Sequence, residues 1–170
     1  MPNNVAVIVE CETDNKLRTL AEVRLAIKDN GGTSTPTSYL FTKKGRVVLE
    51  AKDGVTVEEA LEPALEAGAT DLEEDEDGRI VLFTEPADTR AVGEAVSKSL
   101  GLTIATSEIF WDPNEETQVE VANGAQVEEL GKFLDELREK ESSVQSVAVN
   151  ISQGTLAEDL WEELQGRINA

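Results

Sequence analysis

Seven basic side chains near the start of the chain have the type and spacing to bind a polyanion. They are Lys16, Arg18, Arg24, Lys28, Lys43, Lys44 and Arg46. Arg24 and Lys28 are four residues apart, so a helix places them on one face. Cations on loops and one helix face suit phosphate contact, which gives affinity and salt dependence but little reading of base sequence. We predict that these residues bind RNA; an ordinary solvated surface is the alternative.

The charge of the chain is unevenly distributed. The whole chain has a formal net charge of −20, whereas its first 52 residues carry eight Lys or Arg against six acids. The acids therefore concentrate in the remaining 118 residues. Such asymmetry is typical of a protein with one end that faces a polyanion. The acidic remainder disfavours non-specific binding to nucleic acid.

The residues needed for most catalytic or metal sites are missing. There is no histidine, and Cys11 is the single cysteine, which its valine-rich surroundings predict to be a buried strand thiol. Neither GxGxxG nor GxxxxGK[ST] occurs. The acidic stretch LEEDEDGRI does not fit a calcium loop, because position twelve falls on Thr84 rather than on an acid. We therefore predict no enzymatic activity, no metal and no cofactor.

The opening segment has a β-α-β pattern. The valine-rich run at 5–12 predicts a strand, and Thr19 with Glu22 predicts a capping box that starts a helix. Leu20, Val23 and Ile27 form the apolar stripe of that helix. Residues 38–51 alternate into two strand pieces around a loop that holds the second basic group, and both Tyr39 and Phe41 are expected in the core.

The rest of the chain contains two further patterns of strands and helices. Strands and helices alternate over 45–111 as β-α-β-β-α-β, with a hairpin turn at Asp77-Gly78. A closing β-α-β occupies 117–152, and Thr155 with Glu158 predicts the cap of a last helix whose apolar face includes Leu156 and Trp161. We predict an α+β protein of two ferredoxin-like domains, with 45–114 inserted into an outer domain of 1–44 and 115–170. Two domains in series are the alternative.

The opening stretch resembles the YebC/PmpR family, which includes the mitochondrial translational activator of cytochrome c oxidase subunit one. The family pattern is a valine-rich strand, then E-C-x-T-D-N-x-x-R-T, a V-A-E-V-R-type helix and a G-G stop, followed by Y-L-F before a K-G. Here the motif is supplied by Thr13, Asp14, Asn15, Arg18 and Thr19. Later segments, ALEAGATDLE and DPNEETQVEV, are also similar. The basic helical domain with a G-H-S-K-W motif, with which family members begin, is not in this sequence.

The resemblance implies one ferredoxin-like domain inserted in another. It also implies a non-enzymatic translation factor that binds the ribosome or mRNA in the mitochondrial matrix and supports synthesis of difficult, for example proline-rich, nascent chains. A DNA-binding transcriptional regulator, cytoplasmic if bacterial, is the first alternative. A protein-interaction module that uses the acidic face or the last helix is the second. No apolar run approaches the roughly 18 residues that span a bilayer, so no membrane partner is expected.

Overall fold

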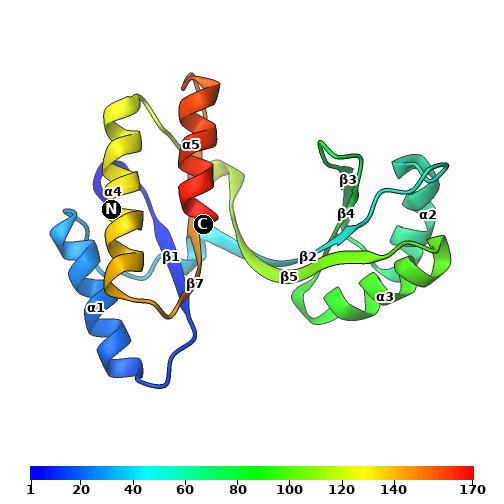
Figure 1. The fold of residues 1–170 in the computed structure, drawn as a ribbon, viewed down its shortest axis with the longest axis horizontal. Helices are drawn as coiled ribbons and strands as arrows, with labels where there is room; N and C mark the ends of the chain where they lie inside the picture. The colour runs from blue at the N-terminus through cyan, green and yellow to red at the C-terminus, as the bar shows by residue number, and fades with distance from the viewer. The chain divides into compact units, whose positions relative to one another are not determined.

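The computed structural model describes all 170 residues, which form two compact units (Figure 1). The outer unit is Met1–Thr42 with Asp112–Ala170, and the inserted unit is Lys43–Trp111. The chain leaves and re-enters the outer unit within two strands, β2 (Phe41–Leu49) and β5 (Ile104–Pro113). The sequence predicts these boundaries two to three residues later. None of the helices combines the length and the apolar composition that a membrane-spanning helix needs.

The inserted unit has the ferredoxin-like arrangement. After β2 come α2 (Val57–Ala67), β3 (Asp71–Glu74), β4 (Ile80–Thr84), the short 3-10 helix η3 (Pro86–Asp88), α3 (Thr89–Leu100) and β5. The sheet order is β3-β4-β2-β5, and β4 pairs antiparallel with both β2 and β3. The predicted α+β class with ferredoxin-like domains is confirmed.

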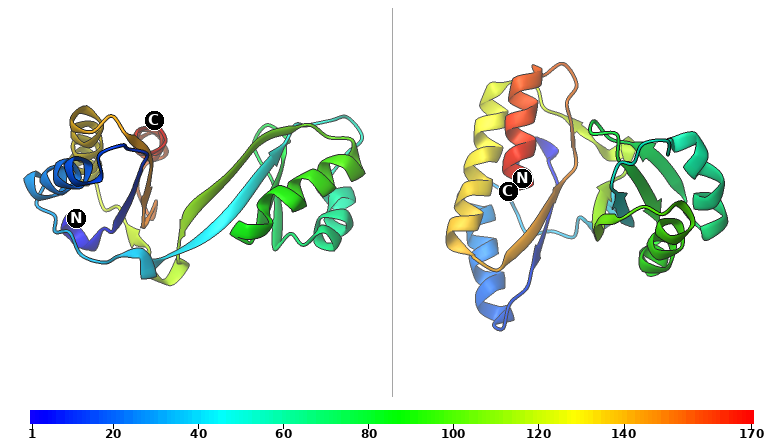
Figure 2. Two further views of the ribbon diagram at one scale, coloured as in Figure 1. Left: turned by 90° about the horizontal axis from the view of Figure 1, so that it is seen from below. Right: turned by 45° about the vertical axis from the view of Figure 1, so that its right-hand side comes forward.

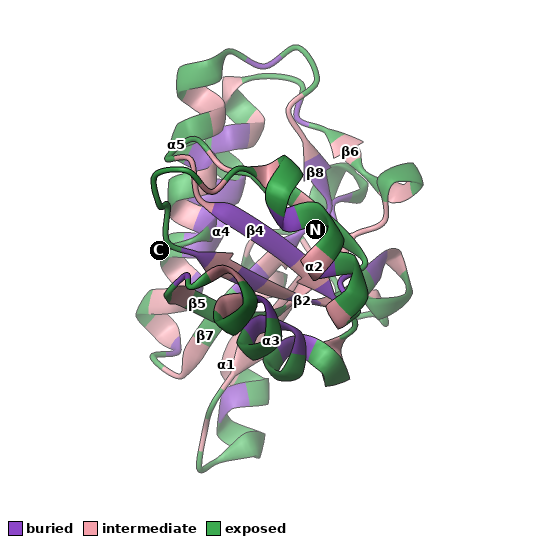
Figure 3. Ribbon diagram, turned by 90° about the vertical axis from the view of Figure 1, so that its right-hand side faces the viewer, coloured by how far each residue is buried: buried purple, intermediate pink, exposed green.

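Alternating side chains explain why α2 and α3 cover one face of this sheet. Val47, Leu49, Ile80 and Leu82 point to one side and pack against small and branched residues of the two helices. The partners on the helices are Ala60, Ala64, Val92 and Val96. Strand β4 is buried except at Phe83, which is half-buried, and both helices lie on the same side of the strand (Figure 3).

The outer unit is built from more distant parts of the sequence. Its elements are β1 (Val7–Cys11), α1 (Lys16–Asp29), β6 (Val119–Glu120), α4 (Gly124–Lys140), β7 (Val144–Val149), β8 (Ile151–Ser152) and α5 (Glu158–Ile168), with short 3-10 helices η1 (Pro2–Asn4), η2 (Ser38–Leu40) and η4 (Glu115–Thr117). Helix α4 packs against α1 and α5 (Figures 1 and 2). The strands make two pairs, β1 with β7 and β6 with β8, instead of one four-stranded sheet.

The side chain of Asn150 joins these two strand pairs. It is 1% exposed; its Oδ1 accepts from the Ala6 N–H at 2.6 Å, and its Nδ2 donates to the Thr117 carbonyl at 3.0 Å. Its backbone carbonyl accepts from the Val119 N–H at 2.8 Å. The side-chain amide thus satisfies a buried backbone N–H beside β1 and a half-buried backbone carbonyl beside β6.

Two predicted helix starts are wrong. Helix α1 begins four residues earlier than a cap at Thr19 predicts, because Asn15 is the N-cap and accepts from the Arg18 N–H at 3.1 Å. Helix α5 begins at Glu158 after Ala157, with no side-chain cap, so Thr155 is not its cap. In both cases the capping-box pattern occurs without its hydrogen bonds.

The apolar face of α5 belongs to the core. Leu156, Leu164 and Ile168 are buried, and Trp161 packs against the same cluster. The Arg138 guanidinium donates to the carbonyls of Arg167 and Ile168, which fixes the end of α5 against α4. Leu156 is therefore packed in the core and Trp161 is half-buried against it, and binding of a partner protein through this helix stays a prediction.

Candidate nucleic-acid interface

The residues of the opening motif build a turn. The Thr13 hydroxyl accepts from the Asn15 N–H at 3.1 Å and from the Thr19 hydroxyl at 2.8 Å. Asn15 in turn caps α1, and Thr19 is buried inside the helix. Thr13, Asn15 and Thr19 therefore hold the end of β1 to the start of α1. Asp14 is exposed, and the structure gives it no role in this turn.

Arg18 faces a buried carboxylate. Its guanidinium lies 3.8 Å from Glu141 Oε1, and the Glu141 side chain is 0% exposed. Glu141 Oε1 also accepts from the Ser143 N–H at 3.1 Å, and the Ser143 hydroxyl lies beside the same carboxyl group. A buried carboxylate at the end of α4 is unfavourable to that helix's dipole, so the Arg18 charge stabilises it. Arg18 is thus a structural residue, whatever else it binds.

The same cluster sets two pKa values. The Ser143 hydroxyl and N–H beside it, helped by the Arg18 charge, lower the pKa of the Glu141 carboxyl from its ordinary 4.5. Burial raises the pKa of the Cys11 thiol, with Glu141 acting in the same direction. Cys11 is half-buried at the end of β1 and free. A thiol with a raised pKa is a poor nucleophile at neutral pH, which agrees with a structural role.

Glu141→Gln is expected to lower stability more at pH 7 than at pH 3. Because the carboxyl has a lowered pKa when folded, its charge stabilises the protein above pH 4.5 and loses this effect as the pH falls through the lowered pKa. Urea unfolding at several pH values measures the difference between the variant and the parent. Glu139→Gln, exposed on the same helix, is the matched control. A difference that stays constant with pH would contradict the prediction.

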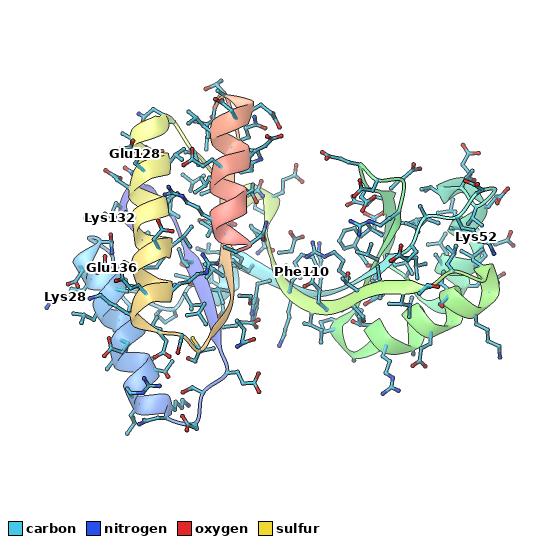
Figure 4. All side chains as sticks on the ribbon, in the orientation of Figure 1. Lys28, Lys52, Phe110, Glu128, Lys132 and Glu136 are labelled. Atoms are coloured by element: carbon cyan, nitrogen blue, oxygen red, sulfur yellow. The ribbon has the colours of Figure 1, made fainter.

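The predicted basic residues of α1 form an exposed row. Lys16, Arg24 and Lys28 are all exposed, and with Leu20 they repeat every four residues along one helix face. Lys28 is visible on α1 in Figure 4. Leu17 is 81% and Leu25 is 44% exposed beside this row, so the surface mixes cations with apolar side chains. Val23 and Ile27 pack into the core as predicted, whereas Leu20 of the predicted stripe is exposed.

A shallow groove of about 630 Å³ borders the row. Arg24 and Leu20 line one part of it, and the hydroxyl-rich segment 33–37 lines another. Tyr39 also lines the groove and is 74% exposed, so its predicted burial is wrong; Phe41 is buried as predicted. The 3-10 helix η2 directs neighbouring side chains outward and ends where β2 begins, which separates the environments of the two rings.

The second basic group lies on a strand and not in the predicted loop. Lys43, Lys44 and Arg46 are all within β2, which runs without interruption. The Arg46 guanidinium pairs with Glu108 on β5, and Lys43 Nζ lies 5.5 Å from the Trp111 ring centroid. Lys43, Lys44 and Arg46 belong to the inserted unit, whereas the α1 row belongs to the outer unit. The seven residues therefore form two groups.

Several residues of these sites were not predicted from the sequence. Glu141, the partner of Arg18, and Glu108, the partner of Arg46, lie far from them along the chain. Phe83 and Phe110 contact each other on neighbouring parts of the inserted sheet. No local signal marks these residues, because each pairing arises from tertiary structure. No three acidic or cysteine side chains converge as metal ligands.

The comparisons identify the family. A family model described as "TACO1/YebC second and third domain" matches residues 1–151. The chain belongs to the TACO1/YebC family. It is 36% identical over 166 residues to a probable transcriptional regulatory protein of Francisella philomiragia, covering 96% of this chain and 63% of the relative. It is 39% identical over 153 residues to one of Mycobacterium tuberculosis, covering 88% and 58%. These relatives carry regulatory names and are bacterial.

A solved structure shares the fold. The crystal structure of a conserved hypothetical protein from Aquifex aeolicus has a TM-score of 0.69 and 35% identity, and the match covers 89% of this chain and 61% of that one. The chain thus spans less than two thirds of the length of these relatives. Helix α5 lies beyond the residues that the family model matches. The expected mitochondrial location finds no support among these bacterial proteins.

Proposed function

We propose that this chain is a non-catalytic, nucleic-acid-binding part of a regulator of gene expression, and that α1 contacts phosphates. The observation that carries the proposal is the row of Lys16, Arg24 and Lys28, exposed on one helix face of a protein with net charge −20. Three cations aligned in this way attract a phosphate backbone, while the acidic remainder limits binding elsewhere.

Transcriptional regulation is the function that the relatives' names support. Both the Francisella and the Mycobacterium relative are named probable transcriptional regulatory proteins. A regulator of this kind would bind duplex DNA in the bacterial cytoplasm. The full relatives are longer than this chain, so the segments beyond it would add to the contact with DNA.

A role in translation is the second candidate, favoured by the composition of α1. Besides Ala21 and Asp29, its exposed residues are Lys, Arg and Leu, and none is Asn or Gln, the amides that read adenine in the major groove. Leu17 and Leu25 stand where a DNA-reading helix carries polar side chains. Such a surface suits backbone contact with a folded RNA, for example that of the ribosome, better than the reading of a DNA sequence.

Reversing the α1 row should remove this contact. The triple variant Lys16→Glu, Arg24→Glu and Lys28→Glu is expected to weaken binding by tenfold or more and to flatten its salt dependence by about 0.7–0.9 per lost phosphate contact. Fluorescence anisotropy across a salt series measures both effects. Arg18 is left unchanged in this variant. Removing its charge would leave the buried Glu141 carboxylate unpaired, and that effect would be mixed with the loss of a phosphate contact.

A second triple variant provides the matched control. Lys52→Glu, Arg90→Glu and Lys98→Glu make the same change of net charge at exposed positions of the inserted unit. Equal weakening by the two triples would remove α1 from the proposal. Duplex DNA shifts that survive competitor RNA would favour transcription, and α1-dependent cosedimentation with ribosomes would favour translation.

A further inference from the structure

One face of the inserted sheet is not covered by any helix of its own unit. Helices α2 and α3 pack on the face that carries Val47 and Leu82. Because side chains alternate along a strand, Arg46 on β2 and Phe83 on β4 point to the opposite face. Lys44 and Val48 share that face with Arg46. This surface contains both cationic and aromatic groups.

Three neighbouring strands bring their side chains together there. Arg46 lies directly opposite Phe83 in the β2–β4 register. The Arg46 guanidinium carbon lies 4.4 Å from the ring centroid of Phe110 on β5, and the Phe83 and Phe110 centroids are 6.2 Å apart. Figure 4 labels Phe110 on β5. Arg46, Phe83 and Phe110 therefore form one continuous patch, which we call the stacking patch.

The stacking patch offers flat surfaces that remain partly accessible. Both phenylalanines are half-buried, and the Arg46 side chain is 37% exposed. Arg46 Nε donates to Glu108 Oε1 at 2.9 Å, which fixes the guanidinium while it lies over the Phe110 ring. A guanidinium stacked on a ring has a second flat side, and nucleic-acid bases stack on such planes as well as on aromatic rings.

We propose that the stacking patch binds an unpaired stretch of RNA, with one base on Phe83 and the next on the Arg46–Phe110 stack. A four-stranded ferredoxin-like sheet with aromatic side chains on its open face is a general platform for this kind of binding. Lys44 adds a cation to the same face beside Arg46, whereas Asp71 and Glu73 on β3 share that face with Phe83 and Val81 and would repel a phosphate. The proposal deepens the proposed function and rests on it.

Unpaired RNA fits this surface better than a duplex. In a duplex the base faces are covered by neighbouring bases, and a flat sheet face cannot enter the major groove. RNA loops and ends present unstacked bases. The ion pair between Arg46 and Glu108 also places a polar group at the centre of the patch, which disfavours a purely apolar protein partner.

The test uses the whole chain and a twelve-nucleotide single-stranded RNA that contains 2-aminopurine, whose fluorescence reports stacking. Phe83→Leu and Arg46→Lys are each expected to weaken binding by about tenfold and to reduce the fluorescence change. Arg46→Lys keeps the charge and loses the plane, so it separates stacking from simple attraction. Ile109→Ala is the matched control, because Ile109 is exposed on the same strand and points to the other face.

The outcomes separate the two proposals. If the α1 triple variant weakens binding while Phe83→Leu and Arg46→Lys bind like the parent, the stacking patch is overturned and the proposed function stands. If Arg46→Lys binds like the parent while Arg46→Gln binds weakly, Arg46 contributes charge only, and the stacking proposal is again overturned. If the parent chain binds neither RNA nor DNA, both proposals are overturned. Thermal melts confirm that each variant is folded.

Discussion

Asn150→Asp is expected to destabilise the outer unit by about 4 kcal/mol at pH 7. The substitution keeps an oxygen for the Ala6 N–H but places a second oxygen against the Thr117 carbonyl, where Nδ2 now donates at 3.0 Å. The new carboxylate is buried beside a carbonyl, and none of the hydrogen-bond partners of Asn150 carries a positive charge. Chemical unfolding gives the free-energy difference.

The pH dependence of this variant identifies the cause. Burial raises the pKa of the introduced carboxyl in the folded state, so the loss of stability is smallest below the unfolded pKa of about 3.9 and grows as the pH rises. Asn123→Asp makes the same chemical change at the exposed N-cap of α4, where Asp and Asn cap equally well, and should leave stability within about 0.5 kcal/mol. Equal effects at the two sites would show that Asn150 does not join the strand pairs as described.

Gly45→Ala is expected to destabilise the inserted unit by about 3 kcal/mol and to lower its melting temperature by more than about 10 °C. A Cβ at this position would meet the hydroxyls of Thr84 and Thr89 and would lie 2.8 Å from the Thr89 Cβ. Those two hydroxyls are buried and hydrogen-bonded to each other at 2.9 Å. The methyl group would break this bond or separate β2 from β4, where Gly45 pairs with Thr84.

Hydrogen exchange followed by mass spectrometry can assign this effect to one unit. Protection should fall in β2, β4 and α3 and stay unchanged in α4. Gly166→Ala, where a Cβ would meet nothing within 4 Å, tests the generic effect of replacing glycine in a helix and should be neutral or slightly stabilising. An unchanged melting temperature for Gly45→Ala would mean that the threonine pair moves aside at little cost.

The order of elements could be predicted because local signals mark it. Gly68 and Gly101 end helices in the left-handed conformation, alternating apolar residues mark β2, and a continuous apolar run marks β4. The start of α1 could not be predicted, because Asn15 and Thr19 are both good caps four residues apart. Burial of Thr19 and its hydrogen bond to Thr13, set by tertiary packing, decide between them.

The sequence indicated which charged residues belong to the candidate sites, but not which other residues lie beside them on the surface. Arg24 and Lys28 were correctly expected on an exposed helix face, because a four-residue spacing fixes their direction, whereas Lys16 and Arg18 were expected in the turn before the helix and lie in its first turn. The polar run at Lys43, Lys44 and Arg46 indicated a loop, yet a strand with one uncovered face accepts polar side chains there. Which partners Arg18 and Arg46 meet depends on α4 and β5, more than sixty residues away, and no local pattern encodes that.

The split of the outer unit along the sequence also fixes an order of events during synthesis. Residues 43–111 are complete before any residue of Asp112–Ala170 has been made, so the inserted unit can fold first. Strand β1, whose Val9 pairs with Val147, must wait for nearly the whole chain. Until β7 emerges, β1 is an apolar strand with unpaired edges, which makes the unfinished chain the form most exposed to aggregation.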